Sequence, residues 1–386
     1  MRSVAVGTKF MLEVNASAIL THLRAARRAS VSALAKETGL SRQAVTRSLA
    51  VLDSMGFVEI SAPDRNATAA GRPPQMVRFR AEAGHVLGVD VQPGQVRLLV
   101  ADLAGDPVAE STLPLSRAGA TELAASLTAA IRQALDLAGV APDCVWHVSA
   151  AAPGITDPGS GHVTLSPSMP EIVGGAILAG IRGAVDAPVY VDNDVKLATE
   201  GERWRGMPHA EDSLVFIDWG ERIGAGIVLR GELYRGASND AGDLGYLDLV
   251  ASGERSGDPD LGPFEAWVGT RELLRVAGGP TLSELAAAAH RGEEWALIPI
   301  RTVAARFAKG IAAVRSLLDP EVVVIGGDIA VLGPALIEAL AEALRAEPLN
   351  QPRLELSALG ADAIIHGAVR HCLSWVERER LYSLPV

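Results

Sequence analysis

An asparagine and an aspartate, Asn193 and Asp194, end PVYVDND, an apolar run of the type that forms a buried strand. A carboxylate can take the proton from a hydroxyl group while that hydroxyl attacks a phosphoryl group. The same carboxylate can also accept a hydrogen bond from a hydroxyl group of a ligand that is bound without reacting. Asp194 is therefore a candidate for a catalytic base or for a binding group. Whether the chain has segments that can bind a phosphate distinguishes the two roles.

The clearest candidate for a phosphate-binding segment is FIDWGERIGAGIVLRG, residues 216–231. Three glycines within seven positions are typical of a turn that brings backbone amides close to a phosphate. Glu221, however, places a negative charge in that turn, and an ion pair between Glu221 and Arg222 would occupy the site rather than open it. The segment therefore predicts a phosphate loop that has lost its ligand.

Strands and helices follow one another in a way that predicts two similar α/β lobes. From residue 86, three apolar runs lead to an Ala/Leu-rich helix at 120–138, and two further strands, CVWHVSAAA and PVYVDND, come next. The scheme restarts at residue 213 with strand, turn and strand, and a helical region leads to the buried strand EVVVIGGDI. This duplication predicts two lobes with a cleft between them.

The N-terminal segment VSALAKETGLSRQAVTRSLAVLDSMG predicts a helix-turn-helix. Its apolar residues fall into two helical sets separated by Gly39, which can adopt the positive φ of a tight turn, and Ser41 is a good N-cap for the second helix. Polar side chains on the outward face of that helix suit phosphates and base edges in a major groove. The predicted DNA contacts are Ser41, Arg42, Gln43, Thr46 and Arg47. A helical hairpin with a solvated, charged face is the alternative.

Two alternating segments, 56–60 and 75–80, predict a hairpin that adds a wing to this motif. The loop between them ends in Gly71-Arg72-Pro73-Pro74, and we expect Arg72 to reach a phosphate or the minor groove.

Charge is divided unequally along the chain. Residues 1–80 carry a net charge of +7 and the remainder carries −18, and a basic end on an acidic protein indicates a nucleic-acid-binding module. The two cysteines, Cys144 and Cys372, lie far apart and match no disulfide or zinc pattern. No apolar run approaches the roughly 18 residues of a membrane helix, so we expect a cytoplasmic protein without a membrane partner.

Together, these motifs resemble those of the ROK family (repressors, open reading frames and sugar kinases), and specifically its transcriptional regulators with a winged helix. The resemblance covers nearly the whole chain and depends on GLSRQAVTRSLAVLDSMGFV, AGRPPQ, LGVDVQPGQVRLLVADLAG, APGITDPGSGHV, VDNDVKLATEGE, IGAGIVLRGELYRGASNDAGDLGY and VVVIGGDI. It implies a winged helix-turn-helix at residues 8–82 and a two-lobed actin/hexokinase-like (ribonuclease H-like) domain. The first lobe would span 85–192, completed by a C-terminal helix at 366–386, and the second lobe would span 193–365.

In the kinases of this family, the aspartate of the Asn-Asp pair is the general base, so the resemblance makes Asp194 a vestigial base. Their first hairpin turn resembles Asp-x-Gly-Gly-Thr, whereas Asp90 is followed here by Val91-Gln92-Pro93-Gly94, in which proline lacks an amide donor and glutamine adds bulk. Their second loop resembles Gly-Thr-Gly-Ile-Gly, and Gly220-Glu221-Arg222-Ile223-Gly224 takes its place. Only the paired glycines 326–327 keep the pattern. We expect neither an ATP cofactor nor catalysis.

On the sugar side, the resemblance implies six effector-binding residues: Asn193, Asp194, Asp243, Tyr246, Glu265 and Ser168. The family's Glu-x-Gly-His motif reads Asp243-Leu244-Gly245-Tyr246, so a phenol replaces the imidazole that helps to bind a structural zinc. The three zinc cysteines of the family are also missing, because segment 249–269 contains neither cysteine nor histidine. We expect no metal site, and a cleft filled only with water is the alternative to a sugar site.

The sequence thus predicts a DNA-binding transcriptional regulator, a repressor, whose degenerate kinase-like domain binds a sugar or sugar-derived effector. We expect it to bind an inverted-repeat operator in double-stranded DNA as a homodimer or homotetramer, since one reading module buries little surface. Two alternatives are an active ATP-dependent sugar kinase with a DNA-binding head and a DNA-binding protein that responds to no ligand.

Overall fold

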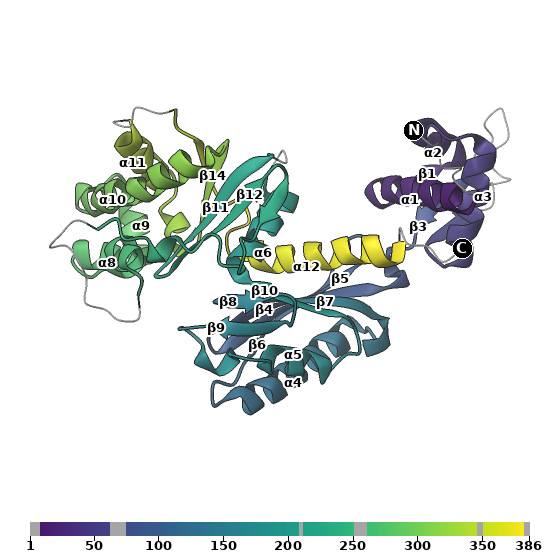
Figure 1. The fold of residues 1–386 in the computed structure, drawn as a ribbon, viewed down its shortest axis with the longest axis horizontal. Coiled ribbons are helices and arrows are strands. Elements are labelled where there is room, and N and C mark those ends of the chain that lie inside the picture. Colours follow the sequence, from purple (N-terminus) through teal and green to yellow (C-terminus); the bar gives the residue numbers. More distant parts are fainter. Residues whose placement is uncertain (1–7, 62–74, 208–210, 251–260, 346–349, 382–386) are drawn as a thin grey trace.

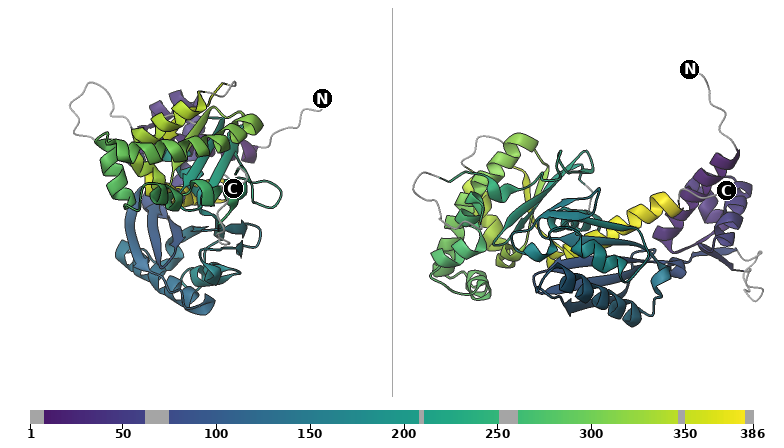
Figure 2. Two further views of the ribbon diagram at one scale, coloured as in Figure 1. Left: turned by 90° about the vertical axis from the view of Figure 1, so that its left-hand side faces the viewer. Right: turned by 60° about the horizontal axis from the view of Figure 1, so that its bottom comes forward.

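The computed structural model describes residues 8–61, 75–207, 211–250, 261–345 and 350–381. Figure 1 shows a small head at one end and two α/β lobes, with one long helix running from between the lobes to the head. The right-hand view in Figure 2 also places the head and the second lobe at opposite ends of that helix. Within these ranges, no helix is long and apolar enough to cross a membrane. The predicted combination of a winged helix-turn-helix and a two-lobed α/β domain is confirmed.

The head is a winged helix-turn-helix with a three-stranded sheet in the order β1-β3-β2. Its elements are α1 (Thr8–Ala26), β1 (Arg28–Ser30), α2 (Val31–Thr38), α3 (Arg42–Ser54), β2 (Val58–Ser61) and β3 (Met76–Phe79). As predicted, Gly39 takes a left-handed φ of 70°, and the Ser41 hydroxyl caps α3 by accepting the Ala44 N–H at 3.2 Å. Helix α1 and strand β1 are additions to the predicted motif.

The first lobe contains a sheet in the order β10-β7-β4-β5-β6. Its elements are β4 (His85–Gln92), β5 (Gln95–Asp102), β6 (Pro107–Pro114), α4 (Ala120–Ala138), β7 (Val145–Ala152), β8 (Ile155–Asp157), β9 (His162–Leu165), α5 (Ala176–Arg182) and β10 (Val189–Asn193). Helix α4 has the predicted bounds. Its buried residues Leu123, Leu127 and Ile131 recur at every fourth position, which places one apolar face against the sheet.

The second lobe contains a sheet in the order β13-β12-β11-β14-β15. Its elements are β11 (Ser213–Trp219), β12 (Ile223–Leu229), β13 (Glu232–Tyr234), α7 (Pro263–Val268), α8 (Thr270–Val276), α9 (Leu282–His290), α10 (Glu294–Leu318), β14 (Val322–Gly326), α11 (Pro334–Leu344) and β15 (Arg353–Leu356). In each lobe, three antiparallel strands are followed by two strands that join in parallel. The predicted duplication is therefore confirmed.

Two helices, α6 (Asp194–Gly201) and α12 (Ala363–Val376), lie between the two sheets, as Figure 1 shows for α12. Their backbones touch, because a Cβ added to Gly367 would lie 1.7 Å from the Leu197 carbonyl oxygen and a Cβ added to Gly201 would lie 2.0 Å from the Ala363 carbonyl oxygen. Only glycine fits at these two positions. Helix α12 starts three residues before the predicted C-terminal helix and continues as π-helical turns over Glu377–Leu381.

The head is attached to the first lobe and to α12 by a shared apolar cluster. Buried residues of α1 and α3 belong to the same cluster as Val369, Leu373 and Val376 of α12. At its edge, Phe57 meets Trp146 edge to face, with ring centroids 5.9 Å apart. This apolar contact fixes the head at the end of α12 that lies away from the lobes (Figure 1).

Ion pairs surround the apolar contact. The Arg24 guanidinium of α1 pairs with the Glu377 carboxylate, and Arg27 pairs with Asp106 at 2.8 Å. Arg24 also donates to the Leu103 carbonyl oxygen at 3.2 Å. The Arg24 and Glu377 side chains are both largely buried, so this pair is screened less than a surface pair.

Candidate functional site

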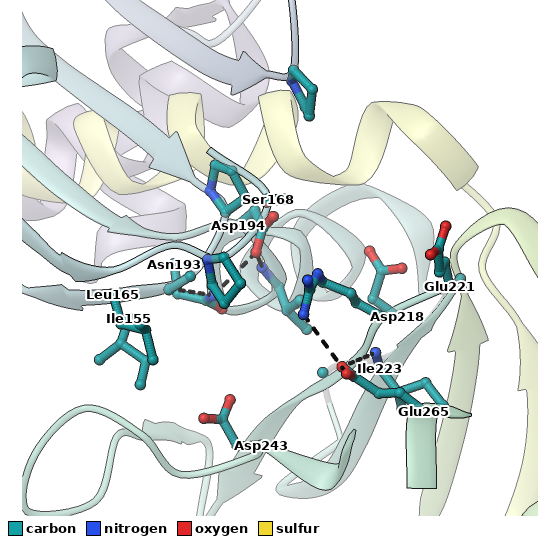
Figure 3. Close-up of a pocket in the computed structure, with 18 of the residues that line it drawn as sticks. Ile155, Leu165, Ser168, Asn193, Asp194, Asp218, Glu221, Ile223, Asp243 and Glu265 are labelled. Atoms are coloured by element: carbon teal, nitrogen blue, oxygen red, sulfur yellow. Dashed lines mark hydrogen bonds and ion pairs between the residues drawn. The ribbon is translucent and has the colours of Figure 1, made fainter. Parts of the chain in front are cut away.

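A cavity of about 570 Å³ lies between the two lobes and is drawn in Figure 3. All six predicted effector-binding residues line it, although they come from four separate segments of the chain. Ser168 comes from the first lobe, Asn193 and Asp194 from the junction of β10 and α6, and the other three from the second lobe. The volume is in the range of small-molecule sites, and the lining has six carboxylates against one cation, Arg222.

Asn193 is the N-cap of α6. Its side-chain oxygen accepts the Lys196 N–H at 3.1 Å, and its amide nitrogen donates to the Gly154 carbonyl oxygen at 2.9 Å. The same nitrogen donates to an Asp194 carboxylate oxygen at 3.0 Å. Asn193 therefore holds Asp194 in place at the start of α6, and little of its hydrogen-bonding capacity is left for a ligand.

Asp194 is the most perturbed carboxyl group of the cavity. One of its oxygens accepts the Val195 N–H at 2.8 Å as well as the Asn193 amide. Burial, followed by the nearby carboxylates Asp218 and Asp90, raises the pKa of Asp194 to about 8. The Asp90 and Asp218 carboxyl groups have pKa values raised to about 6, chiefly by burial. Asp194 thus carries a proton at neutral pH and can donate to a ligand oxygen as well as accept.

Glu265 supports the cavity wall more than it faces the cavity. One carboxylate oxygen accepts the Ile223 N–H at 2.9 Å, and the other accepts the Gly262 N–H at 2.9 Å. The residue is only 4% exposed. Glu265 therefore joins the loop before β12 to the start of α7, a role that the sequence pattern did not predict.

Asp243 and Tyr246 stand on the open side of the cavity. The Asp243 side chain makes no hydrogen bond or ion pair with another described residue, and its pKa is raised because the carboxyl group is partly desolvated. Tyr246 is 53% exposed, so its ring is available to cover a ligand. Ser168 is half-buried, and its carbonyl oxygen accepts from Arg117 at 2.8 Å. Of the six predicted residues, Ser168, Asp194, Asp243 and Tyr246 are the ones with side-chain groups left to bind a ligand.

The first hairpin turn is closed over its own aspartate. The Gln92 side-chain amide donates to an Asp90 carboxylate oxygen at 2.7 Å, and Gln95 in turn donates to the Gln92 side-chain oxygen at 2.7 Å. Asp90 is almost fully buried beneath this pair. Gln92 therefore does more than add bulk, because it covers the carboxylate that stands at the end of β4.

The second loop uses its charges within the second lobe. Glu221 pairs with Arg271, and the Arg222 guanidinium lies 3.8 Å from the Glu265 carboxylate. The two residues do not pair with each other, contrary to the pairing considered from the sequence. Figure 3 shows Glu221 pointing away from the centre of the cavity, while Arg222 lines it.

The glycines that suggested a phosphate loop have a packing role. A Cβ on Gly224 would lie 2.9 Å from a Val195 methyl carbon, and a Cβ on Gly226 would lie 1.8 Å from the Thr199 hydroxyl. Both glycines of β12 therefore make room for α6. Gly326 packs in the same way against Phe216, where a Cβ would lie 2.5 Å from the ring. Close packing accounts for these three positions without a nucleotide.

The zinc site of related kinases has no counterpart among the described residues. No group of three or more histidine, cysteine, aspartate or glutamate side chains in the described ranges is placed to hold a metal ion. A phenol stands at Tyr246, and hydroxyl-bearing or carboxylate groups around it do not replace a Cys₃His ligand set. The residues present do not fit a structural zinc.

The predicted DNA-reading residues share one exposed face of α3. Arg42, Gln43, Thr46 and Arg47 are all exposed, as is Ser41 at the N-cap. Within the described part of the chain, neither Arg42 nor Arg47 forms an ion pair, so both guanidinium groups are free to meet an external anion. Arg72 lies outside the described residues. This exposed face is the predicted reading face, and its role in DNA binding stays a prediction.

Comparison with known proteins matches two family models. The ROK family model matches residues 86–373, and the MarR family model matches residues 12–66. The matched segments divide the chain where the lobes and the head meet.

Individual relatives cover most of the chain. The xylose repressor of Caldicellulosiruptor bescii is 23% identical over 327 residues, which is 79% of this chain and 82% of the relative. A crystal structure of a ROK family transcriptional regulator, homologous to the Mlc protein of Escherichia coli, superposes with a TM-score of 0.76 at 20% identity and covers 97% of this chain and 100% of that one. A ROK family glucokinase from Streptomyces griseus in complex with glucose and AMPPNP has a TM-score of 0.63 at 23% identity and covers 75% of this chain and 99% of the kinase.

Proposed function

The chain belongs to the ROK family, and from that premise we propose that it is a transcriptional repressor whose head binds DNA and whose cleft binds a sugar that controls the head. The single observation that carries this proposal is the exposed face of α3, on which two arginines lack a partner among the described residues. Free guanidinium groups beside a glutamine and a threonine at the N-terminal half of a second helix are what major-groove recognition requires. The xylose repressor relative supports the same function.

The operator would be an inverted repeat read by an even number of chains. One helix-turn-helix contacts few bases, so two heads related by a two-fold axis are needed for a specific site. We propose a homodimer or homotetramer for this reason.

The ligand would be a neutral sugar held by Asp194, Asp243 and Tyr246. Carboxyl groups exchange hydrogen bonds with sugar hydroxyls, and the exposed Tyr246 ring can cover the apolar face of a sugar ring. A cavity with six carboxylates and one guanidinium disfavours a negatively charged sugar derivative.

Phosphate transfer would be lost. Gln92 covers Asp90, Glu221 adds a negative charge, and the glycines at 224, 226 and 326 are used for packing. A protonated Asp194 is also a poor base at neutral pH, because the proton it would have to accept is already there. An active kinase with a DNA-binding head is the second candidate, favoured by the shared fold with the glucokinase.

The sugar would act on the head through α6 and α12. Asp194 is the first residue of α6 and lies in the cleft, and Gly201 and Gly367 allow α6 and α12 to pack in close contact. The C-terminal part of α12 belongs to the apolar cluster shared with the head. A sugar that favours one closure of the lobes would shift both helices together, and by linkage the operator and the sugar must each change the affinity for the other by the same factor.

The test begins with genome-wide mapping of bound DNA, followed by fluorescence anisotropy of the purified protein on a mapped site. We expect nanomolar operator binding that falls when a sugar is added, with D-xylose as the first sugar to try because of the xylose repressor relative. ATP consumption with a panel of hexoses, pentoses and N-acetylhexosamines would instead support the kinase. Operator binding that no sugar changes, together with no thermal shift, would contradict control by the cleft.

A further inference from the structure

A second cavity, of about 600 Å³, shares no lining residue with the cleft. It lies among α6, the π-helical turns that follow it at Glu202–Gly206, the turn between β12 and β13, and α12. Five charged side chains line it: Glu200, Arg203, Glu232, Arg235 and Arg370. Three of the five are guanidinium groups, so the cavity carries more positive than negative side chains in a protein whose net charge is −11.

The three arginines are satisfied to different degrees. Arg235 pairs with the fully buried Asp192 and lies 3.8 Å from Glu200. Arg370 pairs with Glu377 at 3.1 Å. The Nε–H of Arg203 is buried and has no hydrogen-bond partner among the described residues. A buried, charged donor without an acceptor is costly, and Arg203, which lines the cavity, forms no ion pair with a described residue that offsets this cost; an anion bound to the rest of its guanidinium group would do so.

The charges define the class of ligand. Arginine binds a phosphate group through parallel N–H donors, and two arginines from different elements line the cavity, Arg203 from the π-helical turns after α6 and Arg370 from α12. Glu200 and Glu232 supply acceptors for hydroxyl groups, and burial raises the pKa of Glu200, which reduces its repulsion of an anion. A ligand with both a phosphate and hydroxyl groups uses all of these, and the volume suits a small metabolite.

We propose that this cavity binds a phosphate monoester of a small polyol and that the bound phosphate loosens the head. A single residue connects the cavity to the head, because Glu377 pairs with Arg370 at the cavity and with Arg24 of the head. A phosphate on Arg370 competes with Glu377 for that guanidinium. The Glu377 carboxylate then loses one of its two cationic partners, and its position against Arg24 is no longer fixed.

The binding test uses the full-length protein without DNA, so that its outcome is independent of the proposed function. Isothermal titration with inorganic phosphate and with glycerol 3-phosphate, at constant ionic strength, should give one site per chain. Arg203→Gln should lower the affinity by about tenfold or more, because a charge-assisted hydrogen bond is lost. This variant removes no described hydrogen bond or ion pair and should fold. Arg182→Gln, an exposed arginine of α5, is the matched control and should bind as the wild type does.

Two results would overturn the proposal. Equal affinity in the wild type and in Arg203→Gln would exclude the cavity, and loss of binding in Arg222→Gln but not in Arg203→Gln would place the anion in the cleft. The link to the head has a separate readout, operator affinity with and without glycerol 3-phosphate. We expect the phosphate to weaken operator binding in the wild type and to have no effect in Arg203→Gln, whereas an equal effect in both proteins would disprove the link.

Discussion

The reading face of α3 and the cleft between the lobes both carry polar side chains, but those of α3 are exposed, whereas several of those in the cleft are bound to the protein itself. On α3, the side chains of Arg42, Gln43 and Arg47 stand exposed, and the two arginines have no ionic partner in the described chain. In the cleft, Asn193 and Glu265 are bound to backbone N–H groups, and only part of the set remains open. Exposed side chains on a stable helix can bind a rigid partner such as DNA. A small ligand requires a binding site whose side chains are already held in position by the surrounding protein.

The connection between the two regions should be the most sensitive point. In Gly367→Ala, the new Cβ cannot coexist with the Leu197 carbonyl oxygen, so α12 must move away from α6. We expect a loss of about 3 kcal/mol or more in the free energy of unfolding, measured by urea denaturation. Gly201→Ala should act in the same way. A stable Gly367→Ala protein with an unchanged sugar response would show that the two helices do not connect the cleft to the head.

Variants of Glu265 and Asp243 distinguish a carboxylate that supports the wall of the cleft from one that has no described partner. Glu265→Ala leaves the Ile223 and Gly262 N–H groups without acceptors and should lower the free energy of unfolding by about 2–4 kcal/mol. Asp243→Asn, with no partner lost, should change it by less than about 0.5 kcal/mol and instead weaken the binding of a sugar effector. Chemical denaturation and sugar titration of both variants provide the measurement. The opposite pattern would reverse the roles assigned to these residues.

The free arginines of α3 should affect DNA binding alone. Arg42→Ala and Arg47→Ala should each weaken operator binding by about 1–3 kcal/mol and reduce its salt dependence, because contacts to phosphates or base edges are lost. The unfolding free energy should stay within about 0.5 kcal/mol of the wild type, since neither residue has an ionic partner in the described chain. Arg182→Ala serves as the control. Wild-type affinity on a mapped operator would remove both residues from the reading face.

Asp194 should give an effect on stability that is visible as a pH dependence. Its carboxyl group ionises near pH 4 in an unfolded chain and near pH 8 in the folded protein, so the folded state holds the extra proton between these values. Stability should therefore fall as the pH rises from 5 to 8.5, with Asp194 contributing up to roughly 1.4 kcal/mol per pH unit below pH 8, and Asp194→Asn should remove that part of the fall. Thermal unfolding across this range is the measurement, with Asp186→Asn, an exposed carboxylate, as control. Parallel pH profiles for the wild type and Asp194→Asn would contradict the raised pKa.

The reading helix was predictable because its signals are local. Gly39, Ser41 and the apolar spacing of α3 act within a few residues of one another, so they define the turn, the cap and the outward face without the rest of the chain. The glycines of FIDWGERIGAGIVLRG led to a different outcome. They predicted a tight turn correctly, but their contacts with α6 depend on a helix some 25 residues earlier in the chain.

The sequence by itself determined the two lobes and the head, because periodicity, caps and turns are written in neighbouring residues. The set of polar residues that meets in the cleft followed from the resemblance of its motifs to those of the ROK family. Only the tertiary structure decided which of those polar groups already form hydrogen bonds or ion pairs within the protein. Glu265 accepts N–H groups from two other segments, Gln92 folds back over Asp90, and Glu221 and Arg222 pair with different partners. Whether a side chain is free depends on what long-range packing places beside it, and residue type and spacing along the chain do not specify this.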